Sequence, residues 1–547
     1  MTFQPGGFMR RSFLVAAAFI ALPHVAPALA QSVDRTTVAR IIDAGTNHSE
    51  VMVTAEYLSD VIGARLTNSP AMRKAEDWTQ AKFRDWGLTN VHKEGFDFGR
   101  GWSIERSSVR MITPRVIQLT AIPIAWTPST PGPVSAELIV APISKERDFD
   151  KWKGKLKGKI VMLTRPNTGS EPGTAPFRRY TGEDLAKFDS FQQPVYDPET
   201  ADRRLKRLDF AKKLDAFLKA EGAVAYANQA RLDGKLVHGE GYLFGVGETP
   251  TVPGVEIAAE DYRRLARLLK AGMKPTLEID TKVAYDDSDT KAYNIIAEIP
   301  GSDPKAGYVM AGAHLDSWVA ADGAADNGAG VAMIMEAARI LKTTGMQPKR
   351  TIRFALWVGE EQGILGSLAY VEQHLATRGS PNDPPQTGLA RFYGWANRWP
   401  ITTKPGYNDL AAYFNLDNGS GKIRGIFAEN NPAAVPIFRD WLAPFSAMGA
   451  TNVVFQKTGG TDHVFLQAVG LQGFQFIQDP LDYFPRTHHT SLDTFDHLKA
   501  DDMRQASTIL ASFLLNAANA DKALPKPPLP TKPVVTDPYA YPADDDD

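Results

Sequence analysis

From Tyr293 onward the chain alternates short apolar runs with longer stretches of helical periodicity. Strands are expected at residues 292–299, 308–313, 351–358, 410–416, 453–455 and 473–477. Helices are expected to begin near Gly328, Gly363, Pro432 and Asp462, and a last helix is expected from Ala500 to Ala518. This alternation predicts an α/β fold with a mostly parallel (mixed) sheet and helices on both faces.

Residues that commonly bind metals follow several of these strands directly. His314 follows the strand at 308–313, Glu360 and Glu361 follow the strand at 351–358, and Asp417 ends the strand at 410–416. In such sheets the ligand site lies beyond the carboxyl ends of the strands. The sequence therefore predicts that these side chains meet at one edge of the sheet.

The chain contains no cysteine, so a metal would be held by imidazole and carboxylate groups. A pair of zinc ions needs a carboxylate that bridges them and a base that stays off the metals. Asp326 suits the bridge because it lies in a Gly-rich turn, although Asp322 is a nearby rival. Glu360, next to the expected ligand Glu361, suits the base. Asp316 is expected to accept the second N–H of the His314 ring.

Five motifs together resemble the signature of a known enzyme family. They are His314-Leu315-Asp316, Asp326-Asn327-Gly328-Ala329-Gly330, Glu360-Glu361, Asn415-Leu416-Asp417 and His489-Thr490-Ser491-Leu492-Asp493-Thr494. The family is that of the co-catalytic zinc exopeptidases, peptidase family M28, which includes leucyl aminopeptidases, glutamate carboxypeptidase II and carboxypeptidase Q.

The resemblance implies two zinc ions per chain and assigns their ligands. His314 and Asp417 would bind one ion, Glu361 and His489 the other, and Asp326 both. Glu360 would be the general base that activates a hydroxide shared by the ions, and a cis peptide bond would follow Asp326. His488 competes with His489, but the Thr-Ser-Leu-Asp-Thr run after His489 favours His489.

Three further residues are candidates for substrate contact. His463 lies in a turn that resembles a family motif near the substrate, whereas Asp462 beside it is also a plausible helix cap. Tyr483 and Arg486 precede the last expected ligand and are suited to bind an oxyanion or a substrate carboxylate, although an exposed arginine is more often only solvated.

The chain is longer than one hydrophobic core normally supports, at 547 residues. Residues 31–122 are expected to begin the catalytic domain and residues 287–523 to form its main part. Residues 123–286 have no cluster of histidines or acids and resemble the inserted α/β protease-associated domain of the family. Residues 524–547, rich in proline and ending in an aspartate run, are expected to be a disordered tail.

The first 30 residues have the pattern of an export signal. Arg10 and Arg11 precede an apolar stretch, and Ala28-Leu29-Ala30 stands before Gln31. The arginine pair resembles a twin-arginine signal, with an ordinary secretory signal as the alternative. The protein is therefore expected in the periplasm or outside the cell. No later segment has the about 20 apolar residues needed to span a bilayer.

The resemblance implies a zinc-dependent exopeptidase that hydrolyses short peptides, with aminopeptidase activity favoured. A carboxypeptidase or dipeptidase of the carboxypeptidase Q type is the alternative. A receptor without catalysis and a single-zinc acyltransferase are less favoured, because all five ligands and the base are present. The formal net charge of -2 gives no reason to expect a nucleic-acid partner. A dimeric assembly stays open.

Overall fold

The computed structural model describes residues 35–169, 175–192 and 200–533. The expected signal segment, residues 1–30, lies outside them. The main part is a mixed eight-stranded sheet in the order β1-β10-β12-β11-β15-β18-β16-β17. Its strands are β1 (Thr89–Asp97), β10 (Lys291–Ile299), β11 (Tyr308–His314), β12 (Thr351–Trp357), β15 (Leu410–Asn415), β16 (Ile423–Phe427), β17 (Asn452–Val454) and β18 (Gly473–Gln478).

The centre of this sheet is parallel. Strands β12, β11, β15 and β18 run side by side in one direction, whereas β10 and β16 pair with them antiparallel. Because parallel neighbours end at the same edge, the residues after these four strands are brought together. The expected α/β fold is confirmed, and the predicted strands match strands of the sheet.

Helices cover both faces because both faces of the central strands are apolar. In β11, Val309 and Ala311 belong to one hydrophobic cluster, while Tyr308 and Met310 belong to another. This alternation follows from the period of two along a strand. The first face packs against α1 (Arg35–Asn47), α8 (Ala329–Thr343), α11 (Val435–Leu442) and α13 (Ala500–Asn519), and the second against α9 (Leu365–Tyr370), α10 (Gly388–Trp395) and α12 (Val464–Ala468).

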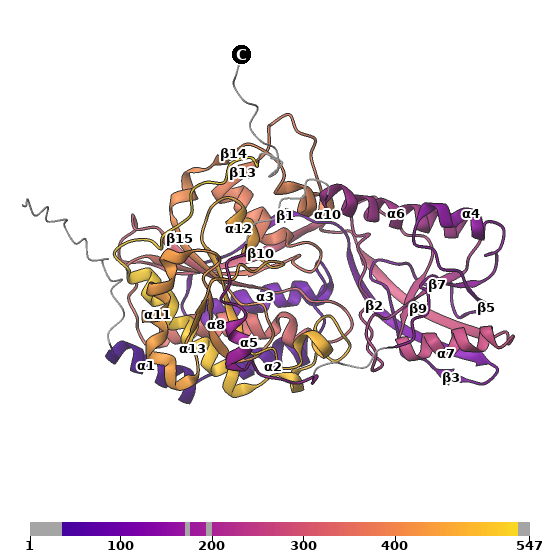
Figure 1. Cartoon of the computed structure of the whole chain (residues 1–547), viewed down its shortest axis with the longest axis horizontal. Coiled ribbons are helices and arrows are strands. Elements are labelled where there is room, and N and C mark those ends of the chain that lie inside the picture. The colour runs from indigo at the N-terminus through magenta and orange to yellow at the C-terminus, as the bar shows by residue number, and fades with distance from the viewer. Residues whose placement is uncertain (1–34, 170–174, 193–199, 534–547) are drawn as a thin grey trace, which may run out of the picture.

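Helices α2 (Val51–Glu56) and α3 (Pro70–Asp85) join the first face. Pro70 stands at the start of α3, and Ser69 caps the helix by accepting a hydrogen bond from the amide of Met72. Figure 1 shows α8 and α13 close together within the main part. Among the described residues, no helix is long and apolar enough to cross a membrane.

A second eight-stranded sheet lies beside the main part (Figure 1), in the order β3-β2-β9-β5-β6-β7-β8-β4. Its strands are β2 (Gly101–Thr113), β3 (Ile117–Gln118), β4 (Ala121–Pro123), β5 (Val134–Val140), β6 (Ile160–Met162), β7 (Ala225–Gln229), β8 (Gly254–Ile257) and β9 (Thr276–Asp286). Helices α6 (Thr200–Ala220) and α7 (Ala259–Lys270) accompany it.

The second sheet begins before the expected boundary at Pro123. Strand β2 pairs with β9 from Gly101 opposite Asp286 to Thr113 opposite Thr276. Residues 101–122 therefore belong to this sheet and not to the main part. We call residues 101–286 the insert.

Part of the insert returns to the main part. The guanidinium of Arg179 contacts the carboxylates of Asp479 at 2.9 Å and Asp502 at 2.7 Å, and Leu185 packs against Phe427 and other apolar residues of the main part. This segment joins the two parts across a wide separation in sequence.

The start of the expected tail is packed on the main part. Leu524 is buried, and the carbonyl oxygen of Pro525 accepts hydrogen bonds from the side chains of Asn431 and Gln472. The expectation of disorder is wrong for these residues, because the chain after α13 continues along the protein surface. Residues 534–547 lie outside the described residues.

Candidate metal centre

Four neighbouring parallel strands deliver the expected ligands to one edge of the main sheet. His314 is the last residue of β11, Glu361 follows β12, Asp417 follows β15, and His489 lies in the loop after β18. The remaining expected ligand, Asp326, lies in the turn that leads into α8. The structure brings all five side chains into one cluster.

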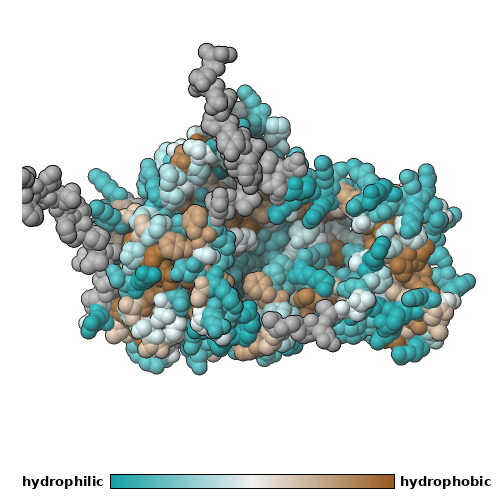
Figure 2. Space-filling view, viewed as in Figure 1, coloured by the Kyte–Doolittle hydropathy of each residue, from teal (hydrophilic) through white to brown (hydrophobic). Residues whose placement is uncertain are grey.

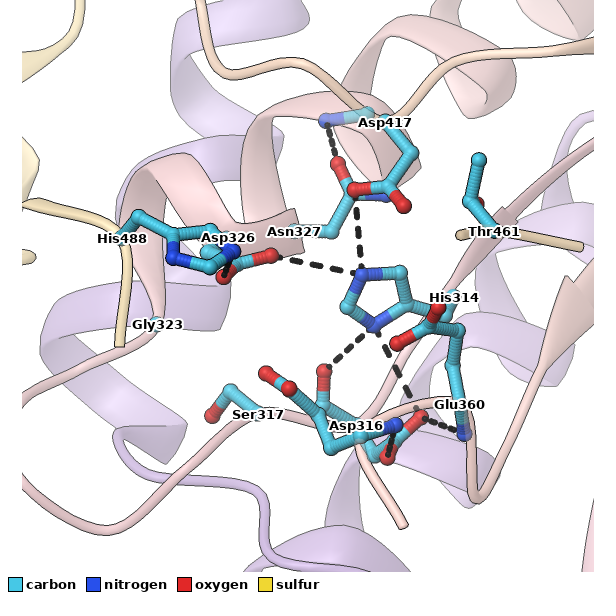
Figure 3. Close-up of polar contacts among 12 residues, drawn as sticks. His314, Asp316, Ser317, Gly323, Asp326, Asn327, Glu360, Asp417, Thr461 and His488 are labelled. Atoms are coloured by element: carbon cyan, nitrogen blue, oxygen red, sulfur yellow. Dashed lines mark hydrogen bonds and ion pairs between the residues drawn. The ribbon is translucent and has the colours of Figure 1, made fainter. Parts of the chain in front are cut away.

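One half of the cluster surrounds His314. Its Nε2 atom lies 3.4 Å from Oδ1 of Asp326 and 3.3 Å from Oδ1 of Asp417 (Figure 3). The ligand atoms of these three residues all lie within 4.8 Å of one another. Imidazole and carboxylate groups at such mutual distances suit a divalent cation.

The other half of the cluster surrounds His489. Its Nε2 atom lies 2.9 Å from Oε2 of Glu361 and 3.3 Å from Oδ2 of Asp326. Asp326 therefore turns one carboxylate oxygen to each half. The rival Asp322 instead has its carbonyl oxygen bound by Arg65 at 2.7 Å, and its carboxylate is not part of either group.

The turn that carries Asp326 is held from three sides. The carboxylate of Asp493 accepts hydrogen bonds from the amides of Ala325 at 2.5 Å and Asp326 at 3.0 Å. The side chain of Asn327 bonds to the carbonyl of Leu416 and the amide of Gly330. The peptide bond between Asp326 and Asn327 is cis, as the family resemblance implies.

His488 also lies near the cluster. Its ring stacks on that of His489, with 3.8 Å between centroids, and its Nε2 atom is 3.9 Å from Oδ2 of Asp326. The ligand atoms of Asp326, His488 and His489 also lie within 4.8 Å of one another, so these three residues are also suited to hold a metal ion. We favour His489 because it lies closer to Asp326 and also contacts Glu361. Burial lowers the pKa of His488 to about 4.

Asp316 does not act on His314 in the expected way. Nδ1 of His314 donates to the backbone carbonyl of Asp316 at 3.0 Å, whereas the carboxylate oxygen lies 3.7 Å away. The carboxylate instead accepts hydrogen bonds from the amides of Glu360 and Glu361, both at 3.3 Å. The side chain of Asp316 therefore orients the turn with the two glutamates, and its main chain orients His314.

The electrostatics of the cluster favour cation binding. Burial raises the pKa of Glu360 well above its ordinary value and that of Glu361 to about 7. Burial likewise raises the pKa of Asp462 to about 8. These carboxyl groups share a space with Asp326, Asp417 and Asp493, so like charges are concentrated where water is excluded. Cations placed among them would favour the ionised forms.

Unpaired oxygens support the same conclusion. Among the described residues, Oδ2 of Asp326 and Oε1 of Glu361 are buried and accept no hydrogen bond. Buried carboxylate oxygens rarely stay without a partner. The donor set, made of imidazole and carboxylate groups in two halves that share Asp326, fits two zinc ions.

The three candidates for substrate contact are placed differently. Tyr483 is buried and, with Asp417 and His488, lines a cavity of about 450 Å³. His463 is fully buried, bonds through Nε2 to the hydroxyl of Thr458 at 3.0 Å, and does not line that cavity. Arg486 is exposed and does not line it either. Only Tyr483 is therefore placed to meet a ligand in this cavity.

Sequence reasoning missed one residue of the cluster, Glu240 in the insert. Its Oε1 atom lies 3.0 Å from Nδ1 of His489, on the opposite side of the ring from Asp326. The hydrogen bond from His489 overcomes the effect of burial and holds the pKa of Glu240 at about 2. No local motif marks Glu240, because its partner is 249 positions away.

A larger cavity of about 1250 Å³ adjoins Glu240 and Tyr242. Most of its lining comes from the insert, and Leu389 and Tyr393 of α10 complete it. Figure 2 shows the surface hollowed between the main part and the insert, with many hydrophilic residues around the hollow.

Comparison with known sequences finds similarity to peptidases. Residues 294–514 match the model of Peptidase family M28. Carboxypeptidase Q of Mus musculus is 25% identical over 478 residues, which cover 86% of each chain. Leupeptin-inactivating enzyme 1 of Streptomyces exfoliatus is 36% identical over 151 residues, 27% of this chain and 31% of that protein.

Solved structures share the fold. A peptidase M28 precursor from Shewanella amazonensis aligns with a TM-score of 0.63 and 22% identity, over 91% of this chain and 99% of that chain. A zinc aminopeptidase from Bacillus subtilis aligns with a TM-score of 0.55 and 18% identity, over 87% of this chain and 98% of that chain.

Proposed function

Because residues 294–514 form a domain of peptidase family M28, which makes the chain a metallopeptidase, we propose that it is a two-zinc exopeptidase acting on short peptides. The observation that carries this proposal is the position of Asp326, whose two oxygens face His314 and His489 separately. His314 and Asp417 would hold one ion, and Glu361 and His489 the other.

The zinc ions and Glu360 would have separate roles in the hydrolysis. Two bound zinc ions would polarise the scissile carbonyl and lower the pKa of a water molecule between them. Glu360 would take a proton from the attacking water and pass it to the leaving amine. Its amide is fixed by the carboxylate of Asp316, so its side chain starts from a defined position beside the ligands (Figure 3). Burial raises the pKa of Glu360, and cations bound beside it would lower that pKa again, so that the carboxylate is ionised and able to accept a proton.

Aminopeptidase activity is our first candidate. The centre concentrates buried carboxyl groups, and the nearby Arg231 is already paired with the Glu240 carboxylate at 2.7 Å. A surplus of carboxylates favours a substrate that brings a positively charged amino terminus.

Carboxypeptidase or dipeptidase activity is the second candidate, and two observations favour it. The similarity to carboxypeptidase Q extends over 86% of the chain and therefore includes the insert. Lys457 also lines the cavity that contains Asp417 and Tyr483, where its ammonium group is available to a substrate carboxylate.

Dipeptides with blocked ends separate the candidates. We expect N-acetylation to abolish hydrolysis and C-amidation to leave it largely intact, because only the first block removes the amino-terminal charge. The reverse result would establish carboxypeptidase action, and loss with either block would establish a dipeptidase. Absence of hydrolysis of every unblocked dipeptide and tripeptide, with zinc bound, would overturn the proposed function.

A further inference from the structure

One segment of the insert that packs on the metal centre is residues 231–242, which we call the docking segment. Its main chain bonds to the loop that carries His489: the amide of Ser491 donates to the carbonyl of Val237 at 2.9 Å. Arg231 donates to the carbonyl of His488 at 3.4 Å. The docking segment therefore packs directly on the ligand loop.

Glu240 is the residue of this segment that contacts a ligand side chain. Nδ1 of His489 lies 3.0 Å from its carboxylate, and Arg231 binds the same oxygen at 2.7 Å. Only about a fifth of the Glu240 side chain is exposed, at 19%. A charged, mostly buried acceptor with two donors has a well-defined position.

The contact has a chemical consequence for His489. A proton on Nδ1, donated to Glu240, leaves the lone pair of Nε2 facing Asp326 and Glu361. A carboxylate that binds the far nitrogen of a ligating histidine fixes its tautomer and ring orientation and makes it a stronger ligand. Without Glu240, that tautomer would lose its acceptor.

The two histidines of the centre, His314 and His489, differ in the group that accepts the hydrogen bond from Nδ1. Nδ1 of His314 is held by the carbonyl of Asp316, two residues along the same chain segment. Nδ1 of His489 is held by a carboxylate that belongs to the insert. Changes in the insert should therefore affect one metal position and spare the other.

We propose that Glu240 is a positioning residue that orients His489 and so makes occupancy of the second metal position depend on docking of the insert. This inference rests on the proposed function, because it takes His489 as a zinc ligand. Glu240 is in neither group of residues that could hold a metal ion, and it acts through the imidazole of His489.

Stepwise zinc binding to the metal-free full chain tests this inference. Calorimetric titration of the wild-type protein should resolve two zinc sites. In Glu240→Ala, one site should weaken by about 10- to 100-fold while the other stays within about threefold of wild type. Glu240→Gln keeps an oxygen acceptor without the charge, so it should restore part of the lost affinity. Cobalt(II) bound in place of zinc should show an altered visible spectrum for the weakened site only.

Glu137→Gln is the matched control, because it removes a carboxylate that pairs with Lys159 within the insert. It should leave both affinities unchanged. Wild-type affinities at both sites of Glu240→Ala would overturn the role of Glu240. Equal weakening of both sites, with a lower melting temperature of the metal-free variant, would also overturn it by showing a general structural role. If the wild-type chain itself binds only one zinc ion, the proposed function fails instead.

Discussion

The backbone amide of Asp326 donates a 3.0 Å hydrogen bond to the carboxylate of Asp493. The other oxygen of Asp493 accepts from the amide of Ala325, so one side chain binds two successive N–H groups. Asp493 is buried and follows His489 in the same loop. The position of the shared carboxylate thus depends on the loop that also supplies a ligand of the other half.

Asp493→Ala should therefore lower both the stability of the fold and the zinc affinity of the centre. It leaves two buried N–H groups unpaired, each of which costs about 1–3 kcal/mol. Zinc affinity should fall by about 10- to 100-fold, because Asp326 is no longer held. Urea unfolding and zinc titration measure the two effects. Asp496→Asn, at an exposed position nearby, is the control. Unchanged stability and zinc affinity in Asp493→Ala would contradict this account.

Glu360→Gln should separate catalysis from metal binding. Glutamine has nearly the same shape but does not take a proton from water, so kcat should fall by about 10²- to 10⁴-fold. Zinc content should remain as in the wild type, since Glu360 is not assigned as a ligand. Steady-state kinetics and metal analysis of the same preparation test both points. Near-normal kcat would refute the assignment of the base.

Glu429 should make stability depend on pH. Its side chain is only 3% exposed, and burial raises its pKa to about 7. Its carboxylate oxygens accept from the amide and hydroxyl of Thr458 and from Gln467. His463 lies 3.8 Å away, but burial lowers the pKa of His463 to about 4, so it brings no positive charge at neutral pH.

The direction of this pH dependence follows from the number of protons that the folded and unfolded states bind. Between the ordinary pKa of 4.5 and the folded value of about 7, the folded state binds more protons than the unfolded state, so stability falls as pH rises. Glu429→Gln keeps the same partners and does not ionise. It should match the wild type near pH 5 and exceed it by about 2–3 kcal/mol at pH 8. Urea unfolding at both pH values measures the difference. If the difference in stability between Glu429→Gln and the wild type does not change with pH, the raised pKa of Glu429 is contradicted.

The export route can be tested at the arginine pair. Changing Arg10 and Arg11 both to lysine keeps the positive charge but removes the twin-arginine feature. We expect the variant to stay in the cytoplasm with residues 1–30 attached, while the wild type is exported and begins at Gln31. Cell fractionation and amino-terminal sequencing give the answer. Normal export of the variant would point to the general secretory route.

Six strands of the main sheet were predictable because they are short apolar runs in which local pattern and burial agree, namely β10, β11, β12, β15, β17 and β18. His314 and Asp417 lie where those runs end, so their meeting at one edge follows from the topology. Strands β1 and β16 were not anticipated, and β16 lies beside β18 through a pairing that crosses a long connection.

Long-range pairing also limited the prediction of the insert and of the centre. The insert begins at Gly101 because β2 pairs with β9, more than 150 residues later, and nothing local to β2 reveals that partner. The role of Glu240 also depends on a long-range contact, because Glu240 meets His489 only when the docking segment packs on the loop that carries His489. The role of Asp316 was divided between its main chain and its side chain, which a sequence does not distinguish.

The most direct test of the two-zinc centre is the amount of zinc bound per chain. Elemental analysis of the purified wild-type protein and of Asp322→Asn should find about two zinc ions in each, because Asp322 lies outside both groups. Asp326→Asn should retain one or none, because it alters the carboxylate that faces both histidines. One zinc ion per wild-type chain, or two in Asp326→Asn, would contradict the account.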